Sequence, residues 1–142
     1  APYKTNFGAF FAKDGRKSGH AGYYMHIEPD HCFIGGGIYK PDSQNLKAIR
    51  QHIYEHPEDF KNIIKNDEFQ SYFPEIHGEK LKRAPKDFPK EFKDIELLKY
   101  KSYAMIHPVS NEFWAQNDLE EQLLKIYKMQ LPFNHFLNKA VN

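Results

Sequence analysis

The stretch HIEPDH holds four side chains that can exchange protons or bind metal ions: His26, Glu28, Asp30 and His31. In a hairpin that turns at Pro29 and Asp30, His26 and Glu28 point to the same side of one strand, and His31 returns on the partner strand. Two imidazoles and a carboxylate form a plausible zinc or iron set. Alternatively, His26 is a general base oriented by Glu28, or all of these are polar side chains on a half-exposed sheet face. His26 and Glu28 are therefore the candidate catalytic residues, and no second cluster of metal ligands accompanies the set His26, Glu28 and His31.

Five further side chains are candidate contacts for a small ligand, and they are cationic or phenolic. They are Lys4, Arg16, Tyr24, Tyr39 and Arg50. Positive groups outnumber carboxylates around the proposed site, which predicts a small anionic ligand. Arg16 belongs to the polar loop KDGRKSGH (residues 13–20), which is either a mobile lid that binds an anion or a solvated hairpin loop. The length and composition of the loop favour the second interpretation.

The run FIGGGIYKPDS places three consecutive glycines shortly before Lys40 and invites comparison with phosphate-binding loops. The dinucleotide fingerprint requires a glycine where Lys40 stands, and a P-loop requires a glycine directly before its lysine. Both motifs also need their glycines between a strand and a helix, whereas Ile38 and Tyr39 continue the strand pattern beyond them. We therefore interpret Gly35–Gly37 as strand glycines, which either lie under cross-strand aromatic rings or mark a bulge or groove.

The alternation of side chains divides the two strands around this turn, residues 22–28 and 32–39, into two faces. A tight turn sets Glu28 opposite His31, so Tyr24 faces Gly35 and Tyr23 faces Gly36. The core face carries Tyr23, Met25, Ile27, Cys32, Ile34 and Ile38. The other face, called the mixed face below, carries Tyr24, His26, Glu28, His31, Phe33 and Tyr39 together with Gly35 and Gly37.

The rest of the chain alternates between strand and helix patterns. Further strands are predicted over residues 6–12, 78–85 and 101–108, and a loop followed by a helix over residues 86–100. Helices are predicted over four segments. The first begins at Asp42 with Leu46, Ile49 and Ile53 inward, and the next two cover residues 57–66 and 67–73. The last covers residues 118–137, with Pro132 as a candidate kink or break and with these side chains inward: Leu119, Leu123, Ile126 and Tyr127. These elements predict an α+β fold in which a largely antiparallel sheet, starting with an N-terminal hairpin or meander, packs against several helices. We expect residues 1–142 to form a single domain.

Composition excludes several classes of protein. The chain has 142 residues, of which 40% are hydrophobic and 15% aromatic, so it can bury a substantial core. Its 20 basic residues nearly balance its 19 acidic ones, which argues against a nucleic-acid partner. Cys32 is the single cysteine, and its place on the core face predicts an inert buried thiol. No signal peptide or membrane span is recognisable, so a reduced cytoplasmic protein is expected.

Several segments together resemble a known family. PYKTNFGAFF, GYYMHIEP, GGGIYKPDSQNLKAIRQHI, LKRAPKDFPKEF and IELLKYKSY are similar to domain of unknown function 2461, uncharacterised proteins of bacteria, plants and fungi. The resemblance runs from Pro2 to about the last helix and implies no reaction, cofactor or catalytic residue. It implies that an N-terminal helical region and an arginine-rich segment usually precede the PYKT motif. The chain is therefore expected to be the C-terminal portion of a longer protein, with the missing arginines near Lys4.

Two functions follow from these patterns. The first is binding or turnover of a small anionic ligand on the mixed face, whether or not the protein is an enzyme. The second is a non-enzymatic interaction or regulatory module that uses a sheet edge or exposed aromatics, with another copy of the chain as a possible partner.

Overall fold

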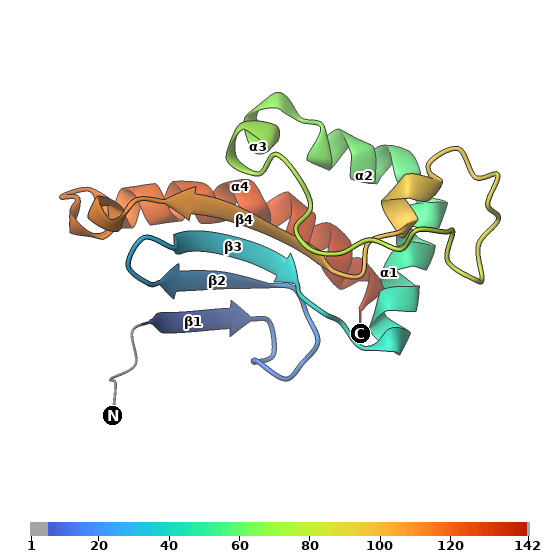
Figure 1. The fold of residues 1–142 in the computed structure, drawn as a ribbon, viewed down its shortest axis with the longest axis horizontal. Coiled ribbons are helices and arrows are strands. Elements are labelled where there is room, and N and C mark those ends of the chain that lie inside the picture. Colours follow the sequence, from blue (N-terminus) through green and yellow to red (C-terminus); the bar gives the residue numbers. More distant parts are fainter. Residues whose placement is uncertain (1–5, 142) are drawn as a thin grey trace.

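A computed structural model describes residues 6–141 of the chain. Four antiparallel strands form one sheet in the order β1-β2-β3-β4 (Figure 1). The strands are β1 (Phe7–Ala12), β2 (Gly22–Ile27), β3 (Cys32–Ile38) and β4 (Tyr103–Val109). The first three form the predicted meander, and a long helical connection separates β3 from β4.

Four α-helices accompany the sheet, which confirms the predicted α+β fold. They are α1 (Ser43–Glu55), α2 (Pro57–Ile64), α3 (Asp67–Tyr72) and α4 (Leu119–Ala140), with the 3-10 helices η1 (Ile95–Leu98) and η2 (Asn111–Ala115). Asp42 begins α1 because its side chain accepts a hydrogen bond of 2.7 Å from the amide of Asn45. Pro57 occupies the first turn of α2, where the missing N–H costs nothing.

The predicted register of the central hairpin is confirmed. Tyr23 pairs with Gly36, and Tyr24 pairs with Gly35. The glycines therefore lie inside β3, and α1 begins only at Ser43, so the geometry of a phosphate-binding loop is not formed.

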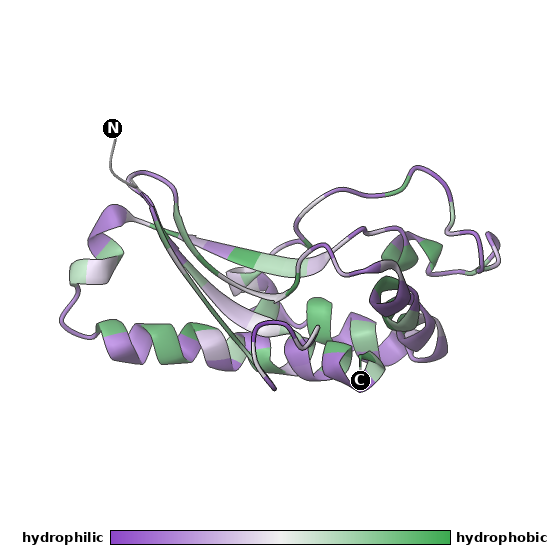
Figure 2. Cartoon of the chain, turned by 90° about the horizontal axis from the view of Figure 1, so that it is seen from below, coloured by the Kyte–Doolittle hydropathy of each residue, from purple (hydrophilic) through white to green (hydrophobic). Residues whose placement is uncertain are grey.

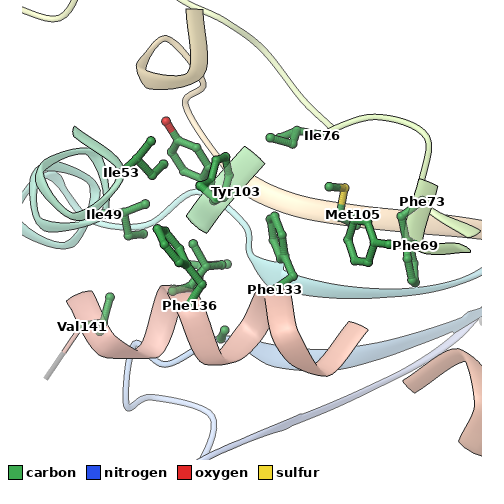
Figure 3. Close-up of a cluster of buried hydrophobic side chains, with 14 of the residues drawn as sticks. Ile49, Ile53, Phe69, Phe73, Ile76, Tyr103, Met105, Phe133, Phe136 and Val141 are labelled. Atoms are coloured by element: carbon green, nitrogen blue, oxygen red, sulfur yellow. The ribbon is translucent and has the colours of Figure 1, made fainter. Parts of the chain in front are cut away.

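The core lies between one face of the sheet and the helices (Figure 3). Ile34, on the predicted core face, is fully buried, and Cys32 and Ile38 are also buried. Helix α4 runs along this face, and its alternation of hydrophobic and hydrophilic residues is visible in Figure 2. The fully buried side chains that join the sheet to α1, α2 and α4 are Ile34, Ile49, Ile53, Phe60, Tyr103, Phe133 and Leu137.

Helix α4 approaches β3 closely at Gly36. The Gln130 side chain fills the space that a Cβ at Gly36 would occupy. Gln130 is fully buried and donates to Asn134 (Nε2–Oδ1 3.0 Å), whose own amide donates to the carbonyl of Gly22 (2.8 Å). Tyr23, which sequence reasoning placed over Gly36, instead packs edge-on against Tyr127 of α4. The bare position in β3 thus admits a helix side chain.

Three predictions for the second half of the chain need correction. Residues 78–85 form no strand, because only Lys80 makes a bridge there, to Tyr100. A strand here would bury little apolar surface, because Leu81 is the single large apolar side chain of the segment and Pro85 ends it. The helix predicted within residues 86–100 shortens to η1, and η2 was not predicted. Helix α4 continues without a break through Pro132.

The contact at Gly36 predicts a large effect of one added methyl group. Gly36→Ala places its Cβ onto Gln130 in a packed interface, so the free energy of unfolding should fall by about 1–3 kcal/mol in urea denaturation. Gln130→Ala in the same chain removes the obstructing side chain, so the double variant should lose less than the sum of the two single variants. Strict additivity would contradict this assignment.

Candidate functional site

The mixed face of the sheet carries a hollow of about 570 Å³, called the sheet hollow below. Its lining comprises Phe10, Arg16, Tyr24, Phe33, Gly35, Gly36, Gly37, Tyr39, His77, Ala104, Met105 and Ile106. These residues come from all four strands, from the β1–β2 loop, from the position directly after β3 and from the segment after α3. The size is that of a pocket for a small organic molecule.

The floor of the sheet hollow is formed by backbone where the large side chains turn away. The ring of Phe10 lies over Gly22, and the Tyr24 hydroxyl lies over Gly8. The atoms nearest to a Cβ at Gly35 belong instead to the backbone of Met105 and to Ile106 in β4. Of the two interpretations left open by the sequence, the structure therefore favours a groove at Gly35 over a glycine covered by Tyr24.

A chain of hydrogen bonds connects three side chains along β2. The Tyr24 hydroxyl lies 3.3 Å from His26 Nδ1, and His26 Nε2 lies 2.9 Å from Glu28 Oε1. The His26 ring stacks on Phe33, with centroids 4.9 Å apart and planes inclined by 22°. Side chains alternate between the two faces of a strand, so residues 24, 26 and 28 lie on the same face and can form this series of hydrogen bonds.

The acceptor at one end of this chain determines the direction of its hydrogen bonds. An ionised carboxylate only accepts, so Glu28 holds the proton of a neutral His26 on Nε2. Nδ1 is then an acceptor, and the Tyr24 hydroxyl donates a hydrogen bond to it. Tyr24 Oη consequently retains lone pairs that can accept a further hydrogen bond. The arrangement has the parts of a base, His26, oriented by a carboxylate, Glu28.

The other candidate ligand contacts separate into two groups. Arg16 and Tyr39 line the sheet hollow together with Tyr24. Arg50 does not line it, because its Nη2 donates to the carbonyl of Tyr100, 2.9 Å away, on the side of the core. Lys4 lies outside the described residues.

The structure does not gather the metal-ligand set considered from the sequence. Within residues 6–141, no group of three or more His, Cys, Asp and Glu side chains is placed to hold a metal ion. His26 and Glu28 bond each other, whereas His31 is exposed at the hairpin turn. Across the same residues, no helix has both the length and the apolar character needed to cross a membrane.

Sequence reasoning missed Phe10 and His77 as lining residues. Phe10 pairs with Tyr24 across β1 and β2, so the register of the first hairpin would have placed it on the mixed face. His77 reaches the site through an isolated bridge to Ala104, in which its amide donates to the Ala104 carbonyl (2.8 Å). No pattern in the neighbouring residues predicts such a bridge.

A second hollow of about 280 Å³ lies where α1 and α2 meet α4. Three histidines line it, His52, His56 and His135, together with Asp59 and Lys139. Burial, followed by the nearby charge of His56, lowers the pKa of His52. The surface mixes cationic groups with a carboxylate and is separate from the sheet hollow.

Comparison with family models identifies the chain. A model described as conserved hypothetical protein (DUF2461) matches residues 1–136. The chain belongs to the DUF2461 family. The family description carries no activity, so DUF2461 membership leaves the chemistry of the sheet hollow to be argued from the side chains themselves. No curated protein and no solved structure matched the chain.

The hydrogen-bond chain predicts the tautomer of His26 in this DUF2461 protein. Nitrogen-15 NMR at neutral pH should show His26 protonated mainly on Nε2. Glu28→Leu removes the acceptor, so the Nδ1–H tautomer should gain population and donate to Tyr24 Oη. Glu112→Leu, which removes an exposed carboxylate of η2, is the control and should leave the tautomer unchanged. Equal populations in wild type and Glu28→Leu would contradict the assignment.

Proposed function

We propose that the sheet hollow binds a small anionic ligand, with Arg16 as the principal contact for its charge. The observation that carries this proposal is the charge of the lining. Among the described residues that line the hollow, Arg16 is the one permanently charged side chain, and none is Asp or Glu. An anion there meets a guanidinium and no opposing carboxylate from the lining.

The setting of Arg16 supports the same conclusion. Among residues 6–141, no carboxylate forms an ion pair with Arg16, whereas several lysines of the chain are paired. Arg16 is an exposed residue of the β1–β2 loop and lines the hollow together with aromatic side chains and backbone. A guanidinium in this position can form a charge-assisted hydrogen bond to a carboxylate or phosphate.

Turnover at the sheet hollow would proceed through Tyr24, which lines it, with His26 and Glu28 bonded behind Tyr24 and outside the lining. A ligand proton taken up at Tyr24 Oη is balanced by transfer of the Tyr24 hydroxyl proton to His26 Nδ1. The resulting imidazolium faces the carboxylate of Glu28, which stabilises it. The proposal thus assigns charge recognition to the loop and proton transfer to β2.

A comparison of two neighbouring cations in the same loop tests the proposal. Carboxylate and monophosphate fragments are screened by 1H–15N NMR, and those that shift the amides of Gly35–Gly37 are titrated. Arg16→Gln should weaken their binding about fivefold, as expected for loss of one partly solvated charged hydrogen bond. Lys17→Gln removes the same charge from a residue that does not line the hollow and should have little effect. Equal binding of the corresponding neutral amides would contradict the proposal.

A second candidate function is association of two copies of the chain through β1. Within residues 6–141, β1 has a partner strand on one side only. Its sequence FGAFFA contains no charge and no proline, the features that usually protect an edge strand. Phe7 and Phe11 on this strand are 55% and 57% exposed. An antiparallel pairing centred on Ala9 would set Phe7 opposite Phe11 of the second copy.

Sedimentation velocity tests the association. Wild type should form a dimer whose population rises with concentration, and Phe11→Lys should abolish it by placing two charges in the pairing. Gln51→Lys adds the same charge on the exposed side of α1 and should leave the dimer intact. A wild-type chain that stays monomeric up to its solubility limit would rule out this function.

A further inference from the structure

The floor of the sheet hollow is bare because small residues of β3 and β4 form it. Gly37 and Ala104 are paired in register across these two strands, and neither carries more than a methyl group. Gly35 is the next β3 residue on the same face. Gly37 adopts a φ of +96°, and a Cβ there would overlap the carbonyl of Tyr103. The bare surface is therefore built into the backbone.

Aromatic rings border this floor. Phe10, Tyr24 and Phe33 stand on one side, and the Tyr24 and Phe33 ring centroids are 5.6 Å apart. Tyr39 directly follows β3, and its ring centroid lies 6.4 Å from that of His77. A flat ligand ring can lie on the peptide planes and present its edge to these side chains, which is the contact that aromatic groups prefer. A puckered aliphatic ring cannot make both contacts at once.

The hydrogen-bond chain adds a polar requirement. Because the hydroxyl proton of Tyr24 is directed to His26 Nδ1, Tyr24 Oη meets the ligand as an acceptor. A ligand hydroxyl or N–H satisfies it, whereas an ether or a second acceptor leaves it unpaired. The site thus discriminates between a ligand that carries a donor and its methylated analogue.

These observations lead to a ligand class. We infer that the sheet hollow takes a flat aromatic acid that carries a hydroxyl or N–H donor, with the ring on the glycine floor, the acid on Arg16 and the donor on Tyr24 Oη. The inference rests on the proposed function, because it retains Arg16 as the anion contact. It adds the shape of the ligand and the position of its second polar group. A hollow of about 570 Å³ has room for two fused rings.

Three probes of nearly equal size separate the components of the inference. 6-Hydroxy-2-naphthoate has the flat ring, the acid and the donor. 6-Methoxy-2-naphthoate lacks the donor, and 6-hydroxydecahydro-2-naphthoate lacks the flat ring. Binding is measured by isothermal titration calorimetry, and the site is located by NMR shifts of Gly35–Gly37. We expect the hydroxynaphthoate to bind about five- to tenfold more tightly than either analogue.

Variants of the intact chain identify the contacts responsible. Tyr24→Phe retains the ring and removes Oη, so the preference for the hydroxyl over the methoxy probe should disappear while the preference for the flat ring remains. Gly8→Ala, whose Cβ would come within 2.9 Å of Tyr24 Oη, should displace the hydroxyl and reduce the same preference. Unchanged melting temperatures establish that these variants fold.

The outcomes distinguish this inference from the proposed function. If all three probes bind equally and Arg16→Gln weakens each of them, the ligand class is wrong and the anion site stands. If the hydroxyl preference persists in Tyr24→Phe, the assigned acceptor is wrong. If no probe binds in an Arg16-dependent manner, the proposed function and the ligand class are both overturned.

Discussion

The close approach of helix α4 to strand β3 is the contact on which the remaining structure depends. It occurs where Gly36 leaves room for Gln130, and the hydrogen bonds from Gln130 to Asn134 and from Asn134 to Gly22 join the helix to two strands. A buried amide costs free energy unless it is bonded, so this network also limits how the helix can be placed. With α4 fixed on the core face, the mixed face becomes the surface available for a ligand.

The glycine run therefore has different consequences on its two faces. Gly36 permits packing against α4, whereas Gly35 and Gly37 leave the other face without side chains. A larger residue at any of the three positions would meet either Gln130 or the backbone of β4. Stability and the shape of the hollow are thus consequences of one short stretch of β3, because a strand alternates its side chains between faces.

Local patterns predicted the elements near this stretch well. The turn at Pro29 and Asp30 fixes the β2–β3 register, which the structure confirms. The predicted core face is confirmed on β3, where Cys32, Ile34 and Ile38 are buried, whereas its β2 residues Tyr23, Met25 and Ile27 are half-buried and lie outside the core cluster. The same patterns could not place His77, which reaches the hollow through a single bridge to a strand 27 residues later. Arg50 was predicted to contact the ligand, but its side chain donates to the carbonyl of Tyr100, and no pattern in the neighbouring residues predicts this contact. Sequence therefore predicted the sheet face of the site more fully than the segments that close it.

The floor of the sheet hollow and Arg16 belong to parts of the fold that tolerate sequence change to different degrees. The floor is backbone held by the core, while Arg16 stands in the β1–β2 loop, where Asp14, Gly15 and Gly19 adopt positive φ angles. Loops of this kind tolerate changes in length and sequence that a packed strand does not. If the hollow binds an anion through Arg16 as proposed, exchange of this loop would alter the charge of the accepted ligand while the shape of the hollow stayed constant. Ligand polarity and ligand shape could then be engineered independently on this fold.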